Sequence, residues 1–312
     1  MKVAIVNTWR GGAVYYISHP IYEYLKEHCK DIEFTYLTVR EIELTPGFDK
    51  SFSEYDLVHF TYFLNAASFM EDLLVPFTCQ VHHFGAGSEE LYSAQLRQWS
   101  PERIVVPETF VQRQLGQRSV ARVVNIPYAF DHTPFKPTTY NEEFKVGFLG
   151  CDGEAKRFDV IRKACANAGV KYRDFDRNTK NEEVDYLDQE EILEFYDDIS
   201  CYVCSSWTDG GPLPPQEALL CGRSVITTPV GMMPMLAEQH GLGNWIVTYD
   251  GSVNELAKKL TYTKGWFAGM QGDDPEVMPE AIAMEARRCL PSVKMVGERW
   301  KDLFTEVLEE LE

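Results

Sequence analysis

Short apolar runs alternate with amphipathic stretches along the first half of the chain. Runs rich in β-branched and aromatic residues predict strands at residues 2–6, 32–38, 57–61, 79–82, 103–106 and 123–126. Apolar residues spaced three and four apart predict helices near residues 17–27, 67–74 and 91–98, and a charged helix or loop precedes residue 57. Strands that alternate with helices are typical of a parallel sheet covered on both faces.

The second half repeats this alternation. The pattern predicts strands at residues 145–149, 171–175, 199–204, 224–227 and 245–247, and helices at 158–168, 189–196, 214–220, 234–240 and 253–262. Residues 126–138 contain three prolines and read as a linker, because proline breaks regular structure. A last amphipathic helix is predicted at residues 292–311.

These elements predict an α/β protein made of two Rossmann-like domains. We expect an N-terminal domain at residues 1–138, a C-terminal domain at 139–291, and a C-terminal helix at 292–312. We expect that helix to pack either back on the first domain or only on its own, C-terminal domain. Open parallel sheets bind ligands at the carboxyl ends of their strands, so we expect a cleft between two such edges.

Composition narrows the class of protein further. The chain has 312 residues, a hydrophobic content of 45% and a formal net charge of −18. This hydrophobic content excludes general disorder, and the negative charge disfavours broad affinity for nucleic acid or anionic lipid. A local basic groove remains an alternative to a solvated helical face for five clustered arginines, Arg97, Arg103, Arg113, Arg118 and Arg122.

Eight cysteines without tight pairing are typical of reduced intracellular thiols. Cys201 and Cys204 fall on opposite faces of a predicted strand, which favours buried packing over metal or redox chemistry. The first residues read as a strand and not as a signal peptide, and no apolar run reaches the ~20 residues of a membrane span. We expect a cytoplasmic protein.

The most informative segment covers residues 205–222. A buried strand leads into the turn Asp209-Gly210-Gly211, and Pro212 and Leu213 precede a helix that carries Glu217. Glycines and helix-start amides can hold an anion, while two carboxylates can accept hydrogen bonds from hydroxyl groups. A nucleotide sugar has hydroxyls at both ends and negative charge between them, and therefore fits this layout.

This segment resembles the donor-site motif of retaining glycosyltransferases with the GT-B architecture, in particular family four, the group 1 enzymes. Asp209 stands where that family usually has Glu. The matching residues are Ser206, Gly210, Leu213, Pro214, Glu217, Ala218 and Gly222.

Four other segments resemble the same family in the correct order. Residues 147–157 resemble a segment of that family that carries a basic residue. Residues 224–234 resemble the strand and loop that follow the donor-site motif in the family, and residues 125–137 resemble its interdomain signature. Gly11 and Gly12 resemble the glycine loop of its other domain. The resemblance reaches from residue 3 to about residue 305 and implies the GT-B fold, with two Rossmann-like domains facing a cleft.

The resemblance also implies roles for individual residues. Asp209 would hold sugar hydroxyls and Glu217 the ribose, while the diphosphate would lie against Lys156, Arg157, Gly210 and Gly211. Gly11 and Gly12 would approach the donor or the acceptor. His82 and His83 would contact the sugar or the acceptor nucleophile, with a core or capping role as the alternative.

Two features bear on the diphosphate. The family's phosphate-binding Arg falls on Cys151, so either Arg157 supplies the missing guanidinium or the diphosphate is held differently. Asp174-Phe175-Asp176 mimics a metal signature of another glycosyltransferase architecture, but it falls at the far end of a predicted strand. We expect no metal and no cofactor.

The predicted function is the metal-independent transfer of a sugar from a nucleotide-diphosphate-sugar donor to an acceptor hydroxyl, with retention as the family implies. The acceptor would be a glycan or glycolipid, or else a hydroxylated base in phage-type DNA. Two alternatives remain: a nucleotide-sugar epimerase of GT-B fold, and a catalytically inactive nucleotide-sugar-binding module.

Overall fold

The computed structural model describes residues 1–10, 12–82, 89–107, 112, 115, 121–150, 154–176, 189–239, 241–270 and 277–312. The chain divides into two compact units. Unit 1 comprises Met1–Asp131 together with Pro291–Glu312, and unit 2 comprises His132–Leu290. Among the described helices, none is both long and apolar enough to cross a bilayer.

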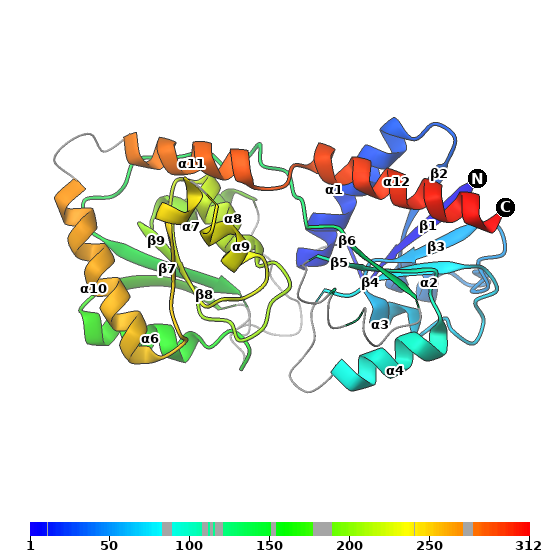
Figure 1. Cartoon of the computed structure of the whole chain (residues 1–312), viewed down its shortest axis with the longest axis horizontal. Helices are drawn as coiled ribbons and strands as arrows, with labels where there is room; N and C mark the ends of the chain where they lie inside the picture. The colour runs from blue at the N-terminus through cyan, green and yellow to red at the C-terminus, as the bar shows by residue number, and fades with distance from the viewer. Residues whose placement is uncertain are drawn as a thin grey trace. The chain divides into compact units, whose positions relative to one another are not determined.

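Unit 1 is built on a parallel sheet in the order β2-β1-β3-β4-β5-β6 (Figure 1). Its strands are β1 (Lys2–Asn7), β2 (Glu33–Thr38), β3 (Leu57–Phe60), β4 (Phe77–Gln80), β5 (Arg103–Val106) and β6 (Arg122–Asn125). Its helices are α1 (Gly12–His28), α2 (Val39–Leu44), α3 (Phe63–Ala66), α4 (Glu89–Trp99) and α12 (Val293–Leu311).

Alternation along the strands gives this sheet two apolar faces. Val3 and Ile5 of β1 belong to one buried cluster, together with residues of α1 and α12. Ala4 and Val6 point the other way and join a second cluster that includes Phe63 of α3. Successive side chains of a strand leave on opposite faces, so an uninterrupted apolar run predicts burial on both.

The C-terminal helix α12 packs along α1 in unit 1. Gly297 is required at this contact, because a Cβ there would lie 2.2 Å from the Tyr24 ring of α1. Trp300 and Phe304 are buried against the sheet. At the far end of the helix, the Arg103 guanidinium donates to Glu306 at 3.0 Å and to Glu310 at 2.5 Å. The last helix therefore completes the core of the first unit.

Replacing Trp300 with alanine should destabilise unit 1 strongly. Trp300 is 6% exposed, and removing a buried aromatic leaves a cavity that costs about 3–5 kcal/mol. Chemical denaturation followed by circular dichroism measures this loss. Leu311→Ala is the control, since Leu311 lies at the end of the same helix with 41% exposure and should change stability by less than about 0.5 kcal/mol. Equal effects of the two substitutions would contradict the packing described here.

Unit 2 is built on a second parallel sheet, in the order β11-β10-β9-β7-β8. Its strands are β7 (Lys145–Gly150), β8 (Lys171–Asp176), β9 (Cys201–Cys204), β10 (Ser224–Thr227) and β11 (Ile246–Thr248). Its helices are α6 (Phe158–Ala168), α7 (Gln189–Asp197), α8 (Leu213–Leu220), α9 (Met233–Ala237), α10 (Val253–Met270) and α11 (Val277–Cys289), with a short 3-10 turn at Leu242–Asn244. The prediction of an α/β protein with two parallel sheets is confirmed.

Two sequence predictions of helices need correction. Residues 67–74 form no helix: a four-residue helix ends at Ala66, and successive turns follow it. These turns bury Phe69 against Phe52 and Phe60, so the apolar spacing reflects core packing. The helix predicted at 253–262 continues to Met270, and α11 was not predicted. Pro279 lies in the first turn of α11, where proline is tolerated.

Candidate functional site

Three loops of unit 2 meet at one edge of its sheet. They follow β7 (residues 154–157), β9 (205–212) and β10 (228–232). Because parallel strands end at the same edge, loops from distant parts of the sequence are brought side by side there. This edge carries most of the site residues predicted from the sequence.

Hydrogen bonds join these loops directly. The Ser205 hydroxyl contacts the carbonyl oxygens of Lys156 at 2.6 Å and Arg157 at 3.0 Å, and the Thr228 hydroxyl donates to the Ser206 carbonyl at 2.6 Å. Gly231 has φ 54°, and a Cβ there would lie 2.9 Å from the Asp209 carbonyl oxygen. The turn that carries Asp209 is therefore packed against the loop that follows β10.

The predicted residues Lys156 and Asp209 form an ion pair. The Lys156 Nζ lies 2.6 Å from Asp209 Oδ2, and the two side chains are 35% and 17% exposed. Asp209 Oδ1 also accepts from the Gly211 amide at 3.3 Å. A ligand at this edge would meet a cation and a hydrogen-bond acceptor within one small area.

Arg157 is held in an unusual backbone conformation at the start of α6. Its φ of 56° and ψ of 45° lie in the left-handed region, which is uncommon for residues other than glycine. Its Nη2 donates to the Gly251 carbonyl at 2.8 Å, and its guanidinium lies 3.8 Å from the centre of the Trp207 ring. Its Nη1 is buried without a hydrogen-bond partner among the described residues.

Helix α8 begins at Leu213, with Pro212 as its N-terminal cap and Pro214 and Pro215 in its first turn. Proline has no amide N–H, so Leu213 and Gln216 are the residues of the first turn that carry backbone donors. Of the amides expected to face an anion at the start of this helix, only that of Leu213 precedes the two prolines. The backbone amides of Gly210 and Gly211 lie in the turn before the helix. The cavity under these loops is about 20 Å³, which is room for about one water.

Glu217 on α8 is held by a residue that the sequence did not suggest. The Tyr196 hydroxyl donates to Glu217 Oε2 at 2.6 Å, and the fully buried Arg223 donates from Nε to the Tyr196 carbonyl at 2.8 Å. Burial and the nearby Glu217 carboxylate raise the pKa of Tyr196 well above its usual value, so this hydroxyl stays protonated. Tyr196 belongs to α7 and to no recognisable motif.

In unit 1, His82 follows the end of β4 and is buried. Its Nε2 lies 2.6 Å from the Thr61 carbonyl oxygen, and its Nδ1 contacts the Tyr128 hydroxyl. A carbonyl oxygen only accepts, so Nε2 carries the proton and both ring nitrogens are engaged. The predicted contact of His82 with a sugar or an acceptor stays a prediction. Gly12 opens α1, whereas Gly11, His83 and Cys151 lie outside the described residues.

Residues 179–263 match the family model of the glycosyl transferases group 1. The resemblance to group 1 glycosyltransferases is confirmed. The match includes the turn with Asp209 and the helix with Glu217, and it indicates a glycosyltransferase. Among curated proteins, none shows significant sequence similarity to the chain.

Solved structures share the fold of the whole chain. Sucrose-phosphate synthase from Thermosynechococcus elongatus is 13% identical, with a TM-score of 0.73 and coverage of 99% of each chain. Anabaena HepE in complex with UDP-glucose is 13% identical, with a TM-score of 0.68 and coverage of 98% of this chain and 100% of HepE. A glycosyltransferase from Rickettsia africae is also 13% identical, with a TM-score of 0.67 and coverage of 98% of each chain. The predicted GT-B fold of this glycosyltransferase is confirmed.

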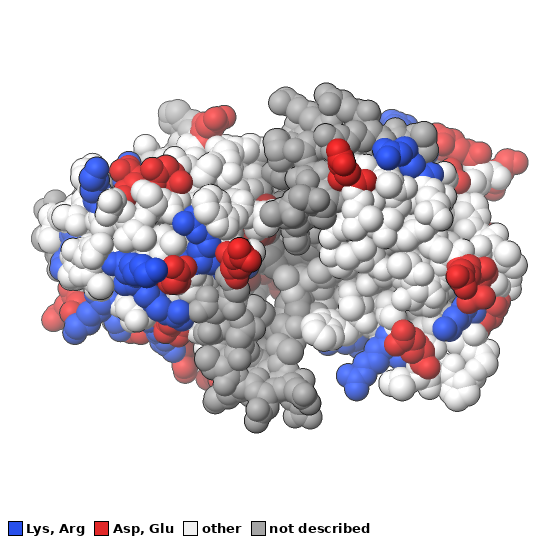
Figure 2. All heavy atoms as spheres, turned by 90° about the horizontal axis from the view of Figure 1, so that it is seen from below, with Lys and Arg blue, Asp and Glu red and all other residues white. Residues whose placement is uncertain are grey.

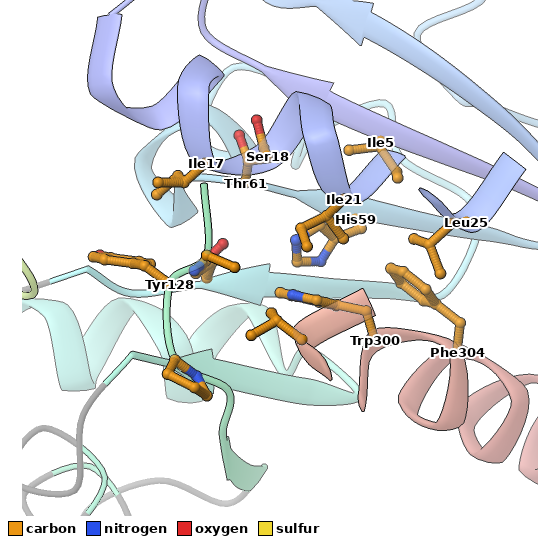
Figure 3. Close-up of a pocket in the computed structure, with 14 residues that line it drawn as sticks. Ile5, Ile17, Ser18, Ile21, Leu25, His59, Thr61, Tyr128, Trp300 and Phe304 are labelled. Carbon is orange, nitrogen blue, oxygen red and sulfur yellow. The ribbon is translucent and has the colours of Figure 1, made fainter. Parts of the chain in front are cut away.

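A separate cavity of about 30 Å³ lies in unit 1 between α1, α12 and the sheet. Figure 3 shows His59 between Ile21 of α1 and Trp300 of α12, with mostly apolar side chains around it. His59 Nδ1 lies 2.8 Å from the Thr78 hydroxyl. Burial, together with the nearby His82, lowers the pKa of His59 to about 3.

The His59 environment predicts a pH-dependent loss of stability. Below about pH 6.5 His59 takes up a proton in the unfolded chain, whereas in the folded chain it stays neutral down to about pH 3. The free energy of unfolding therefore decreases as the pH is lowered from about 6.5. Between pH 7 and pH 5 this residue should contribute about 2 kcal/mol of that fall. Urea unfolding of the natural chain and of His59→Gln at both pH values measures the difference. An identical fall in the variant would contradict a neutral, buried His59.

Two of the five clustered arginines are neutralised by α12. Arg103 is 7% exposed and pairs with Glu306 and Glu310, and Arg122 also pairs with Glu306. Arg113 and Arg118 lie outside the described residues. On the face of each unit that Figure 2 displays, acidic and basic side chains are intermixed, and the described residues form no continuous basic surface there. These features give no support to a nucleic-acid groove.

The Asp174 carboxylate of the Asp174-Phe175-Asp176 segment is paired with Arg162, whose Nη2 lies 2.9 Å from Oδ2. Within the described ranges, no group of three or more His, Cys, Asp or Glu side chains could hold a metal ion. Cys201 and Cys204 are both free and buried.

Proposed function

We propose that this glycosyltransferase moves a sugar from a nucleoside-diphosphate-sugar to an acceptor hydroxyl. The observation that carries the proposal is the ion pair of Lys156 and Asp209 at the sheet edge of unit 2, with Arg157 next to Lys156 in the chain and Glu217 on the helix that follows the Asp209 turn. Two cations and two carboxylates there match a ligand with an anionic centre and hydroxyl groups on each side. UDP is the first nucleotide to test, because the HepE structures contain UDP and UDP-glucose.

In this proposal the two carboxylates bind opposite parts of the donor. Asp209 accepts from hydroxyls of the transferred sugar, and its neighbour Lys156 lies beside the diphosphate. Glu217 accepts from the ribose hydroxyls, and the Tyr196 hydroxyl fixes its orientation. Hydrogen bonds to charged groups are the stronger class, so this arrangement favours a ligand that satisfies both carboxylates.

Arg157 takes the place of the guanidinium that is lost where Cys151 replaces the family's Arg. Its stacking on Trp207 and its bond to Gly251 hold the side chain at the sheet edge. Its buried Nη1 has no partner among the described residues and can donate to a phosphate oxygen. As the bond between sugar and phosphate breaks, the leaving diphosphate gains charge, and Lys156 and Arg157 stabilise it.

We further propose that transfer retains the anomeric configuration. The bond from the anomeric carbon to the phosphate oxygen breaks, the acceptor oxygen bonds to the same face, and its proton passes to the leaving phosphate. No metal is required in this scheme, since Lys156 and Arg157 supply the positive charge. A neutral glycan or a glycolipid is the preferred acceptor; modified DNA is disfavoured, because Arg103 and Arg122 are already paired with α12.

Incubation with radiolabelled UDP-sugars and GDP-sugars, in the presence of EDTA, tests the function. We expect release of the nucleoside diphosphate together with slow hydrolysis or transfer of the label to glycan or lipid acceptors. Glu217→Ala should weaken binding of the active nucleotide by at least about 30-fold, since its charged hydrogen bonds to the ribose are lost. Calorimetry with that nucleotide measures the affinity.

Tyr196→Phe is the graded control, because it keeps the carboxylate and removes one hydrogen bond. It should weaken nucleotide binding by about three- to tenfold. Unchanged affinity in Glu217→Ala would refute the assigned site. A new sugar nucleotide without transfer would indicate an epimerase, and tight binding without any turnover would indicate an inactive binding module.

Arg157→Ala tests the substitute guanidinium. If Arg157 contacts the diphosphate, the variant should bind UDP about 10- to 100-fold more weakly, while its affinity for uridine should change less than about threefold. Titrations with UDP and with uridine separate the two contributions. Equal losses for both ligands would mean that Arg157 supports the fold of the loop and does not contact phosphate.

A further inference from the structure

A groove of about 270 Å³ lies in unit 2, away from the loops described above. It runs between α10 and the first residues of β10 and β11, where Ser224 opens β10. The candidate donor site lies at the other end of these strands, beyond Thr227. The groove is therefore at the amino edge of the sheet, and nothing in the proposed transfer reaction uses it.

Aromatic rings form much of its wall. The rings of Trp245 and Trp266 lie 5.7 Å apart at an angle of 56°, and Tyr262 of α10 is 71% exposed. Exposed aromatic side chains of this size are costly in water and often mark a binding surface. The angle between the indoles does not allow a flat ring to lie sandwiched between them. It leaves two separate apolar faces on a concave surface.

Polar groups complete the groove without adding charge. Thr263 is 6% exposed and contributes a hydroxyl group to the lining of the groove. Asn244 contributes an exposed side-chain amide, and no Lys, Arg, Asp or Glu is among the described residues that line the groove. A ligand that reaches the Thr263 hydroxyl can form a direct hydrogen bond to it. An ion would find no opposite charge here.

We propose that this groove is a second binding site, which holds a neutral sugar unit of a glycan. A pyranose ring has an apolar C–H face that packs on an indole or phenol ring, and a rim of hydroxyls that can bond to Thr263 and Asn244. An aliphatic chain would leave these polar groups unsatisfied. A nucleobase would be held best between two parallel rings, and the tilted indoles of Trp245 and Trp266 cannot sandwich one. The site does not depend on the proposed transfer activity.

Affinity electrophoresis of the full chain tests the groove. Gels contain dextran, hydroxyethyl cellulose or galactomannan as neutral glycans, and alginate as the anionic one. We expect retardation by at least one neutral glycan and none by alginate. Tyr262→Ala and Trp266→Ala should each weaken binding by about five- to tenfold, since each removes one stacking surface. Thr263→Val keeps the side-chain shape and should weaken binding by about two- to fivefold.

Tyr172→Ala is the matched control, because Tyr172 is an exposed aromatic on β8, at the opposite edge of the same sheet. It should leave retardation unchanged, as should Glu217→Ala, which acts at the donor site. Circular dichroism shows that each variant is folded. Retardation by none of the neutral glycans, retardation by alginate alone, or equal retardation of Tyr262→Ala, Trp266→Ala and the natural chain would overturn the proposal. A change in sedimentation of Tyr262→Ala would also overturn it, by identifying the groove as a self-association surface.

Discussion

The candidate site depends on one small set of hydrogen bonds, in which the Ser205 hydroxyl contacts the carbonyl oxygens of Lys156 and Arg157. These contacts join the end of β9 to the turn after β7 and help hold Arg157 in its left-handed conformation. A backbone in that region is strained for a residue with a Cβ, and it persists where the surroundings fix it. The result is that two consecutive basic residues face different partners, Lys156 facing Asp209 and Arg157 facing Trp207.

This arrangement also decides which ligands the edge can accept. Lys156 and Asp209 satisfy each other at 2.6 Å, so an anion alone would compete with Asp209 for Lys156. A ligand that brings an anion to Lys156 and hydroxyl donors to Asp209 satisfies both partners at once. Separating a partly buried ion pair without such compensation is costly. The chemistry of the edge therefore favours a molecule that carries both kinds of group close together.

The sequence could predict the elements because the apolar runs of β1, β5, β9 and β10 are buried on both faces, as parallel strands are. It could also single out Asp209 and Glu217 as candidate site residues, since they lie within one motif. It could not predict the contact between Lys156 and Asp209, which follows from the packing of loops from separate strands. Residues 67–74 misled the prediction because Phe69 is buried from a chain of turns, and burial gives the same apolar spacing as a helix face.

Tyr196 and Thr263 show a more general limit of sequence reasoning. Each lies in a helix as an ordinary polar or aromatic residue, and its importance comes from what the fold places opposite it. Tyr196 meets Glu217 because its side chain reaches from α7 to α8, and Arg223 holds the Tyr196 carbonyl. Thr263 matters because the fold places it in the lining of a groove, together with Tyr262 and Trp266.

The two sites of unit 2 lie at opposite ends of the same strands. A glycan held by one sugar unit at the groove would remain near the protein between reactions, which raises its effective concentration without any new contact at the donor site. The gain depends on whether the chain is long enough to span from the groove to the reacting hydroxyl. A single sugar or a short oligosaccharide would gain nothing, whereas a long polymer would. The dependence of transfer on acceptor length therefore carries information about the groove that binding measurements on monosaccharides cannot give.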